Sequence, residues 1–163
     1  MSIAQIIGIS LGLGSSTLAV ASFFKAITDG NIDPSERGML GVIYIVLRIA
    51  MMTILLSTIA LAFIGYGTVG MAHFTTYVTA QFILVAVLFL NATLMTMRLM
   101  PSTFGPAIQA GSWYLLAFGM ALAAVGLATF SFGTFVIAYV IELVFAFVVI
   151  NGIMRHLKNR RPA

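Results

Sequence analysis

The sequence predicts an all-α protein, a polytopic membrane bundle of five transmembrane helices in a single domain, 1–163. Of its 163 residues, 61 % are hydrophobic and only 7 % are charged, whereas a soluble domain carries about 25 % charged residues. Its apolar runs reach the ~20 residues that a helix needs to cross ~30 Å of hydrocarbon. The basic residues also gather on one side of these runs. Soluble enzymes, disordered chains and nucleic-acid-binding domains are therefore excluded, and no nucleic acid partner is expected.

The five helices are expected at about 3–25, 34–66, 74–98, 110–130 and 133–155. The last apolar run, 113–154, is about twice too long for one crossing, so we expect it to fold back at the Ser-Phe-Gly turn of 131–133. Asp33, Pro34 and Glu36 form the pattern of a helix start, with an N-cap, a first-turn proline and a capping box. The first run lacks a basic flank and is interpreted as a retained helix rather than a signal peptide.

Charge asymmetry predicts the orientation of the bundle. With five spans, one side carries seven basic residues, whereas the other carries no Lys or Arg and only His73; the seven are Lys25, Arg37, Arg98, Arg155, Lys158, Arg160 and Arg161. The positive-inside rule then places the N-terminus outside and the C-terminus in the cytoplasm of a cell inner membrane. A basic cytoplasmic tail is expected at 156–163, and Arg155, Lys158, Arg160 and Arg161 are expected to contact anionic lipid headgroups.

Two charged residues lie deep in the apolar runs. Arg48 is about nine residues into the apolar part of the second helix, and Glu142 is about nine residues into the fifth from its other end. An unpaired charge near the bilayer centre costs ~3 kcal/mol on insertion scales, so we predict an Arg48–Glu142 pair between these helices. Tyr44 and Tyr139 lie on the same helix faces and are expected to hydrogen-bond to the pair. The pair is either a structural lock between helices or a polar site for an ion or proton.

Other residues of the apolar runs predict contacts between helices. Asn91 and Gln81 are expected to form interhelical hydrogen bonds, with a minor role beside the ion pair left open. Small residues let helices approach closely, either within the chain or between chains, and they form two stripes: Gly8 with Gly12 in the first helix, and Gly119, Ala123 and Gly126 in the fourth.

No motif indicates a reaction centre. The spacings match no phosphate loop, metalloprotease helix or nucleophile with a partner base, and the absence of cysteine excludes thiolate chemistry. A bilayer haem needs facing axial ligands, but His73 and His156 are predicted at opposite membrane faces. Neither a cofactor nor a metal is therefore expected.

Several short stretches carry a resemblance to a known group. They are the glycine- and serine-rich 12–17, the pair Phe23-Phe24 before Lys25, the loop 29–32 with Glu36, Asn91 before Pro101, and 112–114 with Gly119. In these the chain resembles a family of uncharacterised small bacterial multi-helix integral membrane proteins. The resemblance implies a fold and a membrane location, and no activity. The chain departs from that group at Gln81, where the group carries Lys, and at Arg48.

These observations favour a non-enzymatic inner-membrane protein, a subunit or scaffold that packs against other membrane chains or against itself. The alternative is a homo-oligomeric ion or proton channel, or a small transporter, that uses the Arg48–Glu142 site. A third hypothesis is the membrane anchor of an electron-transfer complex.

Overall fold

The computed structural model describes residues 2–29, 33–101 and 104–159, and within them the fold is helical and contains no strand. Each of five helices is long and apolar enough to cross a membrane, which confirms the predicted all-α bundle of five candidate spans. A short 3-10 helix, η1 (Gly70–His73), joins the second helix to the third. The five helices are α1 (Ile3–Asp29), α2 (Pro34–Val69), α3 (Thr76–Thr96), α4 (Gly105–Ala124) and α5 (Phe132–Asn159).

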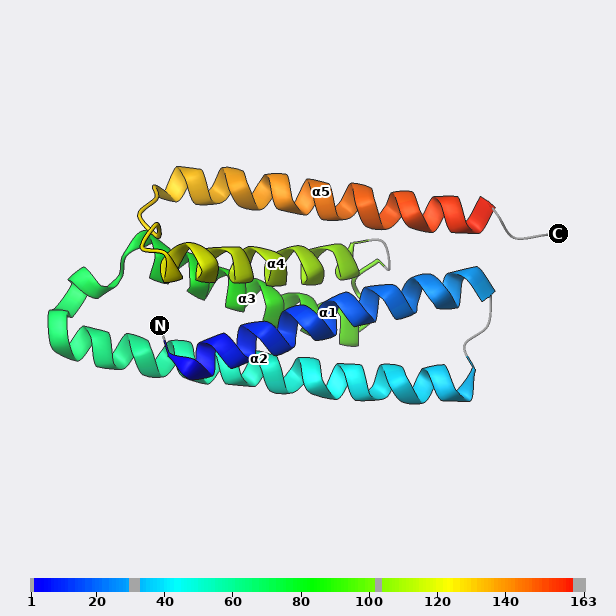
Figure 1. Cartoon of the computed structure of the whole chain (residues 1–163), viewed down its shortest axis with the longest axis horizontal. Helices are drawn as coiled ribbons and strands as arrows, with labels where there is room; N and C mark the ends of the chain where they lie inside the picture. The colour runs from blue at the N-terminus through cyan, green and yellow to red at the C-terminus, as the bar shows by residue number, and fades with distance from the viewer. Residues whose placement is uncertain (1, 30–32, 102–103, 160–163) are drawn as a thin grey trace.

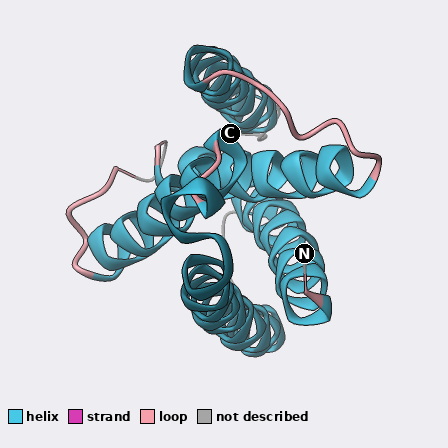
Figure 2. Cartoon of the chain, turned by 90° about the vertical axis from the view of Figure 1, so that its left-hand side faces the viewer, coloured by secondary structure: helices cyan, strands magenta, loops and turns pink. Residues whose placement is uncertain are grey.

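The helices run back and forth along the long axis of the molecule, so the start of α1 and the end of α5 lie at opposite ends (Figure 1). α2 and α5 form opposite sides of the bundle, and α1, α3 and α4 lie between them (Figures 1 and 2). α1 packs along α2, and α4 contacts α1, α3 and α5. One end of the bundle, which we call the basic end, holds the ends of α1, α3 and α5 and the start of α2. The described basic residues there are Lys25, Arg37, Arg98 and Arg155.

Glycines allow α1 to pack closely against both of its neighbours. A Cβ added at Gly8 would lie 3.2 Å from the backbone nitrogen of Ile54 in α2, and one added at Gly12 would collide with the ring of Trp113 in α4. Trp113 is fully buried at the centre of the core. Gly119 of α4 faces the ring of Tyr77 in α3, at 3.6 Å from an added Cβ. The predicted close packing is therefore confirmed at Gly8 and Gly12, within one chain, whereas the contact at Gly119 leaves room for a Cβ. Ala123 is half-buried near the end of α4.

The fourth helix differs from its predicted bounds of 110–130. It begins at Gly105 because Pro106 lies in its first turn, where proline is tolerated. It ends at Ala124 because Gly126 adopts a left-handed conformation (φ +77°), and Leu127 N–H donates to the Leu122 carbonyl at 2.8 Å. The prediction that Gly126 packs against a helix is therefore wrong, since an added Cβ there would meet nothing within 4 Å.

The other helix ends follow local rules. The Asp33 N–H donates to the Glu36 carboxylate at 3.3 Å, as in the predicted capping box, and the same carboxylate group accepts an ion pair from Lys25 at 2.8 Å. α3 ends with the same type of turn as α4, since the Leu99 N–H donates to the Leu94 carbonyl at 2.9 Å. Here Arg98 takes the left-handed position (φ 57°) that usually belongs to glycine. α5 continues to Asn159, so the predicted tail of 156–163 begins inside a helix.

Candidate functional site

Arg48 and Glu142 do not pair within the chain, so this prediction is wrong. An ion pair joins Lys25 to Glu36, and within the described residues neither Arg48 nor Glu142 forms one. Arg48 is exposed on α2, whereas Glu142 is half-buried on α5 and its Cγ lies 3.6 Å from a Cβ added at Gly111 of α4. The two residues are separated sideways, because α1 and α4 lie between α2 and α5 (Figure 1).

Glu142 lines a groove between α1, α4 and α5, with a cavity volume of about 290 Å³. The wall of this groove is mostly apolar, and a hydrogen bond of 2.9 Å between the hydroxyls of Thr17 and Tyr114 crosses it from α1 to α4. Within 2–29, 33–101 and 104–159, no hydrogen bond or ion pair to the Glu142 carboxyl is formed. The groove opens at the surface, because Phe145 and Tyr114 on its rim are exposed. Its chemistry is that of a single half-buried acid in an apolar groove.

Arg48 lies on the outer face of α2, in an apolar setting. Its neighbours on that face are Ile45, Ile49 and Met52, whose side chains are about half exposed. In the described part of the chain its guanidinium has no acidic partner. Its five N–H donors therefore lie on an apolar helix face without an acceptor from the described residues.

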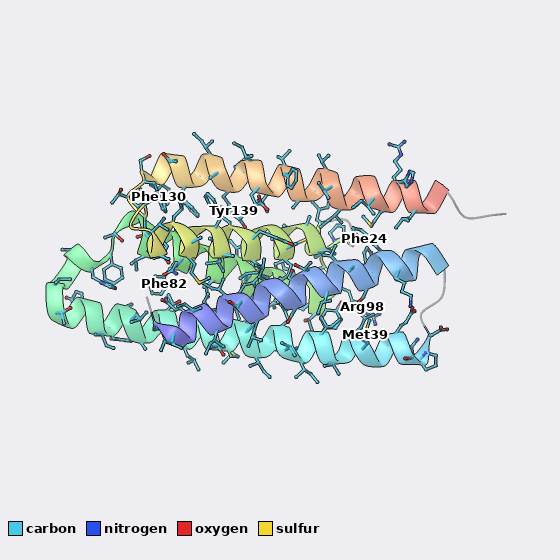
Figure 3. The ribbon with its side chains drawn as sticks, viewed as in Figure 1. Phe24, Met39, Phe82, Arg98, Phe130 and Tyr139 are labelled. Atoms are coloured by element: carbon cyan, nitrogen blue, oxygen red, sulfur yellow. The ribbon has the colours of Figure 1, made fainter. Side chains whose placement is uncertain are left out.

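The two tyrosines predicted to support the pair have other positions. The Tyr139 hydroxyl hydrogen-bonds to the Ser112 hydroxyl of α4 at 2.9 Å, and Figure 3 shows this side chain pointing from α5 toward α4. Tyr44 is half exposed and lines a different cavity of about 300 Å³ at the basic end, together with Arg98 and Gln109. The predicted hydrogen bonds to Arg48 and Glu142 are wrong for both.

Asn91 links α3 to α4, which confirms its predicted interhelical hydrogen bonding. The buried amide donates to the Gly105 carbonyl and to the Gln109 Oε1, both at 3.0 Å. The Gln109 amide in turn faces the Met51 sulfur of α2 at 3.9 Å. This cluster joins three helices near the basic end and contains no charge.

Gln81 forms the matching link toward the other end of α3. Its carbonyl accepts from the Gln5 amide of α1 at 3.5 Å, and its own amide donates to the Tyr77 hydroxyl at 3.0 Å. Gln5 and Gln81 are both buried, and Thr58 of α2, also buried, lies beside them in a small cavity. The interhelical role predicted for Gln81 is confirmed, and neither amide cluster includes Arg48 or Glu142.

Gln5, Gln109 and Ser112 are structural partners that the sequence reasoning missed. Gln109 lies one residue before the expected start of the fourth helix at 110, whereas Pro106 in the first turn marks a start at Gly105. Gln5 and Ser112 were visible as polar residues in apolar runs, and that signal would have identified them.

The residues predicted to contact lipid headgroups are only partly described. Arg155 is exposed at the basic end. The Lys158 side chain, Arg160 and Arg161 lie outside the described residues. The histidines lie at opposite ends of the bundle, since His73 closes η1 and packs on Gly65, whereas His156 is in the last turns of α5.

Comparison of the chain with protein-family models, with curated proteins and with solved structures found no match. The resemblance to uncharacterised bacterial membrane proteins therefore stays an expectation.

Proposed function

We propose that the chain is a non-enzymatic, multi-pass membrane subunit that packs against other membrane chains through its two sides, α2 and α5. The carrying observation is that Arg48 and Glu142 lie on these opposite sides, without a partner in the described parts of the same chain. Each charge costs ~3 kcal/mol near the middle of a transmembrane helix. A neighbouring chain that supplies an acid to Arg48 and a cation to Glu142 offsets both costs.

The proposal includes a topology. Arg98 and the other three residues of the basic end favour placing that end in the cytoplasm of a bacterial inner membrane, with the N-terminus outside. Arg155 and the basic residues after it then contact anionic headgroups.

The experiment is extraction of the tagged chain from its membrane in native lipid discs, followed by single-particle mass measurement and mass spectrometry of the bound proteins. We expect particles with more than one polypeptide, held together by the two sides. Charge-neutral R48Q and E142Q variants, each checked for folding by circular dichroism, should release the partner. Particles that contain a single 17.4 kDa chain would contradict the proposal.

A channel or small transporter is the second candidate, supported by the Glu142 carboxyl in a groove of about 290 Å³ that opens toward the bilayer. In this function the carboxyl binds and releases a proton or cation. Proton flux into proteoliposomes that is present for the wild type and absent for E142Q would favour this candidate. No observation on the described residues favours an electron-transfer anchor.

A further inference from the structure

We propose that the partner is a second copy of this chain, and that Arg48 of one copy pairs with Glu142 of the next. The inference rests on the proposed function and names its partner. It is carried by three properties of the two residues: their charge, their depth and the sides on which they lie.

The first property is charge complementarity. α2 presents one cation in an exposed apolar face, and the groove of α1, α4 and α5 presents one acid among apolar and aromatic side chains. In the described residues no second charge accompanies either of them at mid-helix. The two sides of one molecule are therefore complementary to each other.

The second property is depth. Arg48 follows Arg37 by 11 residues, and Glu142 precedes Arg155 by 13 residues, which places the charges about 17 and 20 Å from the same end at 1.5 Å per residue. Copies inserted in one orientation are related by a rotation about the bilayer normal, and such a rotation leaves depth unchanged. Arg48 of one copy therefore reaches the level of Glu142 of its neighbour.

The third property is the position of the two sides. α2 and α5 lie on opposite sides of the bundle in both views (Figures 1 and 2), so one copy cannot satisfy its own charges, but it can pair with a neighbour on each side. Such a head-to-tail contact uses two different surfaces and repeats from copy to copy, closing into a ring where the rotation allows. A symmetric two-fold dimer of parallel chains would instead place two arginines or two glutamates together.

The test uses cysteine crosslinking between differently tagged copies, because the chain has no native cysteine. One copy carries I45C and the other F145C. Both residues are exposed, and each lies three positions closer to the basic end than its charged neighbour. The charges themselves remain intact in this pair.

The matched control replaces I45C with L56C. Leu56 is exposed on α2 11 residues after Ile45, which is close to three full turns, so it has nearly the same direction but lies about 17 Å deeper along the helix. We expect I45C with F145C to give a crosslinked pair that carries both tags, and L56C with F145C to give none.

Charge variants then test the pair itself. R48E or E142R alone should abolish the crosslink, and chains that carry both R48E and E142R should restore it, because the pair is reversed but kept. Where a reversed charge prevents insertion, R48Q and E142Q serve instead and should each reduce the crosslink yield at least tenfold.

The outcomes separate this inference from the proposed function. A crosslink that forms equally with L56C, or that survives R48Q and E142Q, would overturn the Arg48–Glu142 contact. Particles that contain a different protein and one copy of this chain would also overturn it, although the proposed function would stand. Single chains in every preparation would overturn both.

Discussion

The contact between Gly12 and Trp113 makes G12A an informative substitution. Glycine to alanine inside a helix is normally favourable by ~1 kcal/mol. At Gly12 the new methyl group would collide with the indole ring of Trp113. That ring is fully buried and cannot move into lipid. Overpacking of this kind costs ~1–3 kcal/mol, so α1 must shift or the ring must leave its rotamer.

Gly14 provides the matched control. It lies two residues after Gly12 and therefore about 200° around the helix axis, on the other face of α1. It is exposed, and an added Cβ there would have open space around it. The difference between G12A and G14A isolates the collision from helix propensity. At about 2–4 °C per kcal/mol for a chain of this size, the Tm of G12A should be lower than that of G14A by about 2–12 °C.

The assay is thermal unfolding in one detergent, followed by circular dichroism, with W113F added to form a double-mutant cycle. W113F removes part of the ring that the methyl group meets, so G12A should be less harmful in the W113F background than in the wild type. Equal Tm values for G12A and G14A would refute the close packing of α1 on α4.

Three further substitutions test local features. N91A leaves the Gly105 carbonyl and the Gln109 amide oxygen without their donor, so unfolding in detergent should require ~1–3 kcal/mol less free energy; an unchanged stability would exclude this link. G126A places a side chain at φ +77° and should cost ~1 kcal/mol, measured as a lower Tm, and a neutral result would contradict the helix cap. R98G removes a side chain from the same left-handed conformation, at φ 57°, and should raise the Tm, whereas a lower Tm would show that the arginine side chain outweighs its backbone cost.

The number of helices could be predicted because it depends on a property of each segment alone. An apolar run long enough to cross the bilayer has one stable arrangement, a helix with its backbone hydrogen bonds satisfied internally. Helix ends were predicted correctly where a local pattern controls them, as at Asp33 and Glu36. The end of α4 was missed because hydrophobicity continues past Gly126, although the backbone conformation of that glycine ends the helix.

The partners of the polar residues could not be predicted, because depth and lateral position are independent. Arg48 and Glu142 were assigned similar depths, but sequence contains no direct signal that α1 and α4 separate α2 from α5. For the buried amides, the sequence predicts the kind of contact but not the partner. Asn91 and Gln81 were correctly expected to bond across helices, and their partners Gln109 and Gln5 were not identified.

These amide links explain how α3 keeps its rotation in an apolar environment. Lipid is as apolar as leucine, so burial of apolar surface does not distinguish one face of a transmembrane helix from another. Gln81 and Asn91 lie ten residues apart on α3, about 2.8 turns, so their directions differ by about 80° around the helix axis. One bonds to α1 and the other to α4. Two directional contacts to two different helices fix the rotation of α3, whereas the charged residues on α2 and α5 are left outside this network and remain available to a neighbouring chain.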